Sequence, residues 1–256
     1  MKNKSGKTQK RLKNSIFWIY GYHATVAALR NSNRRKYELL ITLDAQKRIS
    51  QENNLNALNE VKQKILSRVE IDNLVGKNIN HQGICLSVEK IQKKSIKEFI
   101  SEQNEKYSTL VLLDQLEDSQ NVGAIFRSAL AFNIDGILLT ENQSVSENGF
   151  IAKSACGGLD KVPFTYISNL SSAIKTLKDN GYWVYGLDGM AKKLINEIDF
   201  PNKTVLILGS ESDGIRKITS SFCDELIKIK ISDQLESLNV SNTAAVVFYH
   251  LNRRIS

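Results

Sequence analysis

The sequence has few cysteines and no long apolar run, and each shortage excludes a class of protein. Its three cysteines, Cys85, Cys156 and Cys223, stand singly, without a CxxC pair or neighbouring histidines, so we expect neither disulfides nor a metal site. No segment approaches the ~18 consecutive apolar residues of a membrane span, and the lysine-rich start is not followed by an apolar signal-peptide segment. We therefore expect a cytoplasmic protein that does not enter a membrane.

The composition is that of a globular protein with an excess of positive charge. The chain has 256 residues, of which 41% are hydrophobic, which suits one or two domains with a real core and excludes collagen and wholesale disorder. It has 35 Lys and Arg against 27 Asp and Glu, a net charge of +8. Residues 1–48 hold twelve basic and two acidic side chains, a net of +10, which leaves −2 for the rest.

This positive charge near the N-terminus has two interpretations. A basic arm followed by the cluster Arg34-Arg35-Lys36 is typical of a protein that binds a polyanion, because each neutralised phosphate releases counterions. A solvated tail that only keeps the protein soluble would have the same composition. Charge alone leaves both open, and a membrane surface is less favoured because the tail lacks an amphipathic apolar face.

The apolar pattern divides the chain into a tail, two domains and a linker. Residues 1–15 are polar and basic, and we expect them to be disordered. A small αβ unit is predicted over 16–90, and residues 91–108 form a charged linker that runs into a helix. Over 109–256 short apolar strands alternate with helical stretches, which indicates an α/β domain with a parallel sheet covered on both faces. The predicted strands are 109–114, 136–140, 163–167, 182–187, 204–209 and 226–229.

Three polar segments follow strands of this sheet, where open parallel sheets bind their ligands. They are 114–127, 209–214 and 235–241. Each has a plain structural interpretation. Asn121 and Asn239 would cap helices, Gly209 and Gly214 would serve tight turns, and Arg127 would face water.

Taken together, the segments resemble the three signature motifs of the SpoU/TrmH family of RNA 2'-O-ribose methyltransferases, LDxxxDPxNxGAIxR, GSEGxG and SLNVS. Residues 153–158 with Val162-Pro163 resemble that family's segment after the second strand of the catalytic domain. Residues 21–24 and 81–84 resemble the ribosomal-protein-L30-like substrate domain of the branch that modifies a guanosine in 23S rRNA. The resemblance covers residues 16–254.

The chain departs from the family pattern at three positions. Ser119 stands where proline is usual, Ser212 replaces the middle glycine of the second motif, and Lys230 follows Ile229 where proline is common. Loss of a proline leaves a looser turn and removes no chemical group. We expect altered cofactor affinity at most.

The resemblance implies a trefoil-knotted parallel-sheet domain that binds S-adenosylmethionine in the knot and forms homodimers through that domain. General topology rules would argue against a knot, so this expectation comes from the family alone. By position in the motifs, Gly209, Ile229 and Leu238 would supply backbone contacts to the cofactor.

The resemblance also implies a set of catalytic residues, Arg127, Asn121, Glu211, Ser237 and Asn239. A ribose hydroxyl is a poor nucleophile, so the enzyme must align it with the methyl group and help to remove its proton. A guanidinium has a pKa above ~12. Either a desolvated Arg127 takes the proton, or Arg127 clamps the adjacent phosphate while another group accepts the proton, and the sequence leaves both open.

In the N-terminal domain the candidates for RNA contact are Tyr22, His23, Arg34, Arg35 and His81. RNA is read mainly at loops, by stacking and hydrogen bonding, and these residue types suit both. The competing interpretation is that the tyrosine and the two histidines are packed structural residues.

The function expected from these features is S-adenosylmethionine-dependent ribose 2'-O-methylation of RNA, with a guanosine of 23S rRNA as the first choice. Two alternatives stay open, a tRNA methyltransferase of the same family and a non-catalytic RNA-binding or ribosome-assembly protein. A dehydrogenase is less favoured, because no GxGxxG follows the first strand of the α/β region.

Overall fold

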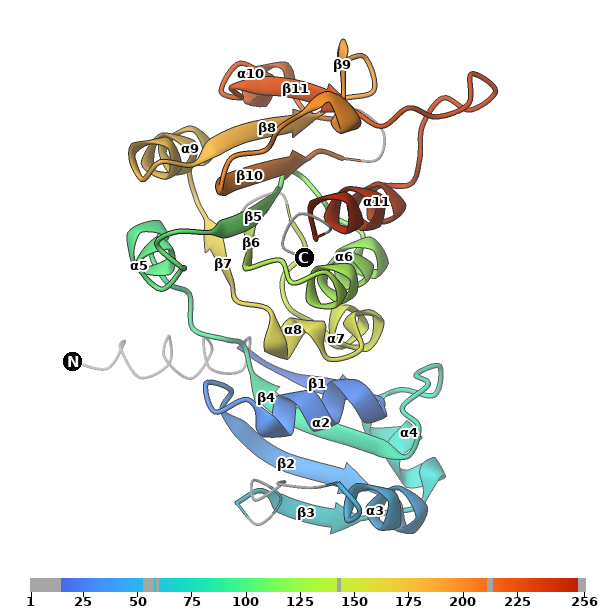
Figure 1. Cartoon of the computed structure of the whole chain (residues 1–256). Coiled ribbons are helices and arrows are strands. Elements are labelled where there is room, and N and C mark those ends of the chain that lie inside the picture. Colours follow the sequence, from blue (N-terminus) through green and yellow to red (C-terminus); the bar gives the residue numbers. More distant parts are fainter. Residues whose placement is uncertain (1–14, 53–57, 59, 142–143, 211–213, 253–256) are drawn as a thin grey trace, which may run out of the picture. The chain divides into compact units, whose positions relative to one another are not determined.

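The structure is a computed structural model that describes residues 15–52, 58, 60–141, 144–210 and 214–252 (Figure 1). The chain forms two compact units. One contains residues up to Gln92 together with Glu147–Lys161, and the other contains Lys93–Ser146 and the chain from Val162 onward. Residues 147–161, expected to belong to the C-terminal domain, therefore group with the N-terminal unit.

The N-terminal unit is built on a four-stranded sheet in the order β1-β4-β2-β3. β4 pairs antiparallel with β1 and β2, whereas β2 and β3 are parallel. Its strands are β1 (Ile16–Tyr20), β2 (Lys36–Ile41), β3 (Lys62–Ile65) and β4 (Ile84–Glu89). Its helices are α2 (Tyr22–Arg30), α3 (Leu43–Ile49), α4 (Arg68–Val75), α7 (Gly149–Ala155) and α8 (Gly158–Lys161).

A buried ion cluster holds the segment 147–161 on this unit. Arg34 is only 2% exposed. Its Nη1 donates to Glu147 Oε2 at 2.7 Å, and its Nε donates to Asp160 Oδ1 at 2.7 Å. Burial raises the pKa of Glu147, and the positive charge of Arg34 opposes that rise. Arg34 is thus part of the core, because two buried carboxylates require a buried cation.

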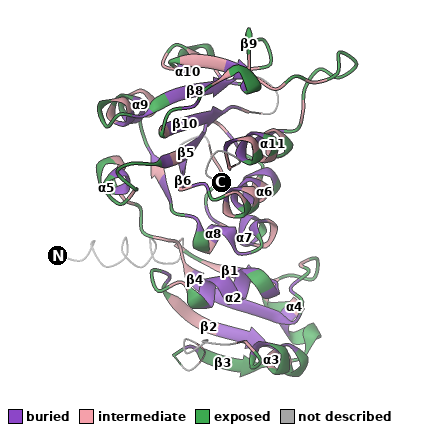
Figure 2. Cartoon of the chain, in the orientation of Figure 1, coloured by how far each residue is buried: buried purple, intermediate pink, exposed green. Residues whose placement is uncertain are grey.

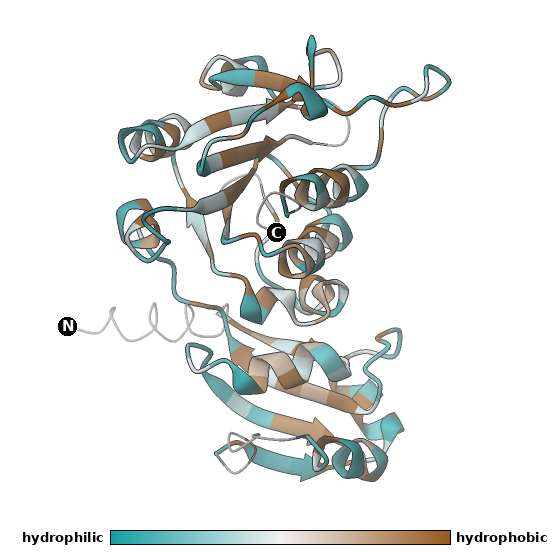
Figure 3. Cartoon of the chain, viewed as in Figure 1, coloured by the Kyte–Doolittle hydropathy of each residue, from teal (hydrophilic) through white to brown (hydrophobic). Residues whose placement is uncertain are grey.

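The C-terminal unit is built on a parallel sheet in the order β7-β6-β5-β10-β8-β11-β9. Its inner strands are continuously apolar because both faces are covered, and β5 and β10 are buried along most of their length (Figures 2 and 3). The strands are β5 (Ser108–Leu113), β6 (Gly136–Thr140), β7 (Phe164–Ile167), β8 (Trp183–Leu187), β9 (Lys193–Leu194), β10 (Lys203–Leu208) and β11 (Glu225–Lys228). The predicted fold class, an α/β protein with a small N-terminal αβ unit and a C-terminal parallel sheet, is confirmed.

Two layers of helices cover this sheet (Figure 1). α6 and α11 lie side by side over one face, while α5 and α9 pack over the other through Phe99, Ile174 and Leu177. The helices of the unit are α5 (Ile96–Ser101), α6 (Ser119–Ala131), α9 (Leu170–Asp179), α10 (Lys217–Ser220) and α11 (Val240–Asn252). After β5 the chain adds β6 and β7 on one side, and β10 and β8 lie on the other side. The order therefore reverses at β5 and β10, where an open parallel sheet binds its ligand.

Candidate active site at the carboxyl edge of the parallel sheet

The segment after β10 folds back on itself at Gly209. The Ser210 amide donates to the Gly214 carbonyl at 3.0 Å, and the Gly214 amide donates to the Ser210 carbonyl at 3.1 Å. A Cβ at Gly209 would overlap the carbonyl group of Gly214, so only glycine permits this loop. Glu211 and Ser212, both singled out from the sequence, lie outside the described residues.

A cavity of about 420 Å³ lies beside this loop and between β10, β8 and β11. We call it the β10–β11 cavity. Gly209, Ile229 and Leu238, the three residues expected to contact a cofactor, all line it, and so does Ser237. Its volume lies within the ~300–1,000 Å³ typical of small-molecule sites. The structure thus brings together residues from the second and third motifs.

Another wall of the cavity comes from the segment after β8, which was not predicted from the sequence. Asp188, Gly189 and Met190 line it. The Met190 amide donates to Asp188 Oδ1 at 2.8 Å, which fixes the turn, yet the Met190 residue is 90% exposed. The sequence did contain a signal for this part of the site, because the segment also follows the carboxyl end of a predicted strand.

The first and third motifs meet through a pair of asparagines. Asn239 Nδ2 donates to Asn121 Oδ1 at 3.1 Å, and Asn121 Nδ2 donates to Asp118 Oδ2 at 3.2 Å. Asn239 Oδ1 also accepts from the Ser241 amide at 2.9 Å, so it has the capping role that the plain interpretation gave it. Asn121 does not cap its helix, because Asp118 caps α6.

A second link joins the first motif to the chain that follows the second. Arg216 donates from Nε and Nη2 to the two carboxylate oxygens of Asp114, at 3.1 and 2.7 Å. Thr219 Oγ1 donates to the same carboxylate at 2.7 Å. Asp114 is buried, so this bidentate pair fixes the loop after β10 against the end of β5. Arg216 could not be predicted from the sequence, because its partner lies about a hundred residues earlier.

Arg127 is exposed on α6. In the part of the chain that the structure describes, no carboxylate pairs with its guanidinium and no group forms a hydrogen bond with that guanidinium. Its guanidinium is therefore free to meet a substrate anion.

Three of the five RNA-contact candidates, Tyr22, Arg34 and His81, are buried in the N-terminal unit, and RNA contact by the five stays a prediction. Tyr22 is buried and its hydroxyl donates to Glu52 Oε1 at 2.9 Å. His81 is buried, with Nε2 at 3.2 Å from Asp72 and Nδ1 accepting from the Gly83 amide. Arg34 is held in its ion cluster. His23 and Arg35 remain exposed.

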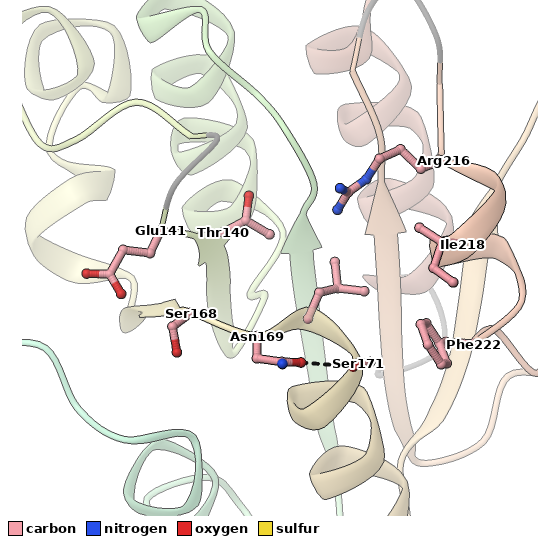
Figure 4. A pocket seen from close by; sticks show the side chains of 9 residues that line it. Thr140, Glu141, Ser168, Asn169, Ser171, Arg216, Ile218 and Phe222 are labelled. Carbon is pink, nitrogen blue, oxygen red and sulfur yellow. Dashed lines mark hydrogen bonds between the residues drawn. The ribbon is translucent and has the colours of Figure 1, made fainter.

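A second cavity, of about 450 Å³, lies at the ends of β6 and β7. Figure 4 shows Arg216, Ile218 and Phe222 on one side of it and Thr140, Glu141 and Asn169 on the other. None of the site residues expected from the sequence lines it.

Two kinds of feature are absent from the described residues. No group of three or more His, Cys, Asp or Glu in those ranges is placed to hold a metal ion. Among the same residues, no helix has the length and apolar character needed to cross a membrane.

Two family models match the sequence, and each falls on one region of the chain. Residues 108–249 match the SpoU rRNA methylase family. Residues 18–94 match the substrate-binding domain of RNA 2'-O ribose methyltransferases.

The curated relatives include two enzymes of nearly equal length. The chain is 34% identical over 241 residues to the 23S rRNA (guanosine-2'-O-)-methyltransferase RlmB of Coxiella burnetii, covering 92% of this chain and 95% of the relative. It is 28% identical to the enzyme of the same name from Xylella fastidiosa, covering 93% and 96%.

Solved structures share the fold. The SpoU methyltransferase AviRb from Streptomyces viridochromogenes, in complex with the cofactor AdoMet, matches with a TM-score of 0.79 at 20% identity, covering 97% of this chain and 94% of that one. An AdoMet-bound rRNA methyltransferase from Sinorhizobium meliloti matches with a TM-score of 0.80 at 17% identity, covering 97% and 91%.

Proposed function

The chain belongs to the SpoU rRNA methylase family, and from this premise we propose that it transfers a methyl group from S-adenosylmethionine to a ribose 2'-hydroxyl of RNA. The observation that carries the proposal is the convergence of the three motifs at one edge of the sheet. Gly209, Ile229 and Leu238 line one cavity, and the asparagine pair joins the first motif to the third.

The substrate that we propose is a guanosine of 23S rRNA. Support comes from the relatives that carry this activity in their names and that match nearly the whole chain. The N-terminal unit supports it as well, because its sequence matches an RNA substrate-binding domain. We also propose that the reaction takes place in the cytoplasm.

The residues of the β10–β11 cavity fit S-adenosylmethionine. The absence of a side chain at Gly209 leaves the backbone open to a ligand. Leu208, Ile229 and Leu238 offer apolar surface, whereas Asp188 and Glu236 bring negative charge to the lining, which suits a cofactor with a sulfonium cation. When bound, the cofactor supplies an activated methyl group.

Arg127 acts in this proposal as a phosphate clamp that orients the ribose hydroxyl. A guanidinium accepts no proton at ordinary pH, and the Arg127 side chain is exposed to water. Its planar fork suits two phosphate oxygens. Asn121 and Asn239 hold the neighbouring loops in place, Ser237 contacts the ribose, and Glu211 orients the basic partner.

We also propose a homodimer formed through the C-terminal unit and a trefoil knot in the same unit. The knot is proposed from family membership. For the dimer, the exposed apolar side chains Val246 and Tyr249 on α11 offer surface to a second copy.

The test is methylation in vitro with labelled S-adenosylmethionine, followed by mapping of the modified nucleotide. We expect label at one guanosine ribose of 23S rRNA and none in tRNA. Label confined to tRNA would overturn the rRNA substrate, and an absence of both cofactor binding and label would favour a non-catalytic assembly protein.

A further inference from the structure

We propose that Lys153 binds a backbone phosphate of the RNA substrate at the first turn of α2. This inference deepens the proposed function and rests on it. It joins residues 21–24 and 153–158, two segments that the sequence analysis singled out and that the active site leaves unused.

Lys153 lies directly against the backbone of Gly21. A Cβ at Gly21 would lie 2.7 Å from Lys153 Cδ and 3.1 Å from Cε, and it would overlap Nζ. Gly21 also has a φ of +86°, which glycine adopts at little cost. The absence of a side chain at position 21 therefore leaves the space in which the lysine side chain lies.

The position of this ammonium group is electrostatically unfavourable within the protein. Gly21 is the N-cap of α2, and a helix N-terminus carries partial positive charge that disfavours a cation. In the described part of the chain, no carboxylate pairs with the Lys153 ammonium group and no side chain or carbonyl forms a hydrogen bond with its Nζ. Burial also lowers its pKa.

Other groups in the first turn of α2, or just before it in the sequence, also lack partners among the described residues. The amides of His23 and Ala24 form no hydrogen bond with the described chain, as expected for the first turn of a helix. The Tyr20 hydroxyl, directly before Gly21, is buried and has no partner among the described residues. Burial raises the pKa of Tyr20 to about 12, so this hydroxyl stays a neutral donor.

The buried Cys85 thiol cannot act as the missing anion. Cys85 and Cys156 are the titratable groups that act on Lys153. Burial raises the pKa of Cys85 to about 12, so its thiol is uncharged at neutral pH. Cys156 is exposed and its sulfur donates to the Lys153 carbonyl. One phosphate, with several acceptor oxygens, would satisfy the ammonium group and the free amides together.

The experiment measures the affinity of the full chain for a 23S rRNA fragment over a range of KCl concentrations. We expect Lys153→Gln to reduce the slope of log Kd against log[KCl] by about 0.7 and to weaken binding about fivefold at 0.1 M salt, as for one lost phosphate contact. Lys153→Arg should retain most of the affinity. Lys161→Gln, a change at an exposed lysine of the same unit, is the matched control and should leave the slope unchanged.

A second variant tests the same contact from the side of Gly21. Gly21→Ala places a methyl group where the lysine side chain lies and should reproduce the reduced slope. Thermal melts identify variants that fail to fold. A slope for Lys153→Gln equal to those of the wild type and Lys161→Gln overturns the inference, even if the wild type methylates rRNA. A wild type that binds the fragment through Lys153 without methylating any RNA would instead overturn the proposed function.

Discussion

At the residue scale, the chemistry depends on side chains that the fold leaves open toward substrate. Arg127 is exposed on the same helix that carries the buried Asn121, so one side chain of α6 is fixed and the other is available. Met190 is equally open at the mouth of the β10–β11 cavity. For each of these two side chains we state a prediction that a single substitution tests.

We expect Arg127→Ala to lower kcat/KM for RNA methylation by about 10²-fold or more, because the hydroxyl loses the group that orients it. Affinity for S-adenosylmethionine should not change, since Arg127 does not line the cavity. Lys175→Ala, at an exposed position on α9 over the opposite face of the sheet, is the control. Near-normal turnover in Arg127→Ala would remove this arginine from the mechanism.

Met190 should become covered when the cofactor binds. The sequence contains only two methionines, Met1 and Met190, so a sample labelled with ¹³C at the methionine methyl groups reports on this position almost alone. We expect S-adenosylmethionine to shift the Met190 signal, and Met190→Ala to weaken cofactor affinity by up to about tenfold, as for a lost contact of sulfur with an aromatic ring. Met190→Leu should lose less. A Met190 signal that does not move on saturation would contradict this.

At the element scale, the helices α7 and α8 are fixed by charge as well as by apolar packing. The ion cluster joins the loop after α2 to the segment 147–161 through Arg34, Glu147 and Asp160. Removal of the cation from such a cluster leaves two buried carboxylates without compensation. The free energy of unfolding should therefore fall strongly when Arg34 is replaced and change little when the neighbouring Arg35 is replaced.

We expect Arg34→Met to lower the free energy of unfolding of the N-terminal unit by about 3–5 kcal/mol in urea titrations. The neighbouring change Arg35→Met, at an exposed side chain, should stay within about 0.5 kcal/mol of the wild type. Equal effects of the two substitutions would show that the cluster does not hold the segment.

The pH dependence of this variant has a definite sign. Burial already raises the folded-state pKa of Glu147, and loss of Arg34 removes the attraction that opposes the rise. A carboxyl whose pKa is higher in the folded state loses stability as pH rises through that pKa. The deficit of Arg34→Met should therefore grow from acidic to neutral pH, and Glu147→Gln in the same chain should reduce that growth.

Much of the C-terminal sheet could be predicted because its strands are buried on both faces and so are continuously apolar. β9 was missed, since its two residues, Lys193 and Leu194, carry no such run. The ion cluster could not be predicted either, because Arg34 stands in a basic run and its partners lie more than a hundred residues away. The bidentate pair of Asp114 and Arg216 was missed for the same reason.

At the scale of the whole molecule, the order of the strands in the sheet brings the three motifs together, although they are far apart in the sequence. β10 inserts between β5 and β8, so the segments after β5, β10 and β11 reach one edge although they are far apart in the chain. Family resemblance indicated Gly209, Ile229 and Leu238, and the structure adds Asp188 and Met190 to the same cavity.

The measurement that tests this convergence most directly is calorimetric titration of the full chain with S-adenosylmethionine. We predict saturable binding at one site per chain, retained in Arg127→Ala and lost in Gly209→Ala, where the added methyl group would overlap the Gly214 carbonyl. Absence of saturable binding by the folded wild type, or undiminished binding by Gly209→Ala, would contradict the account.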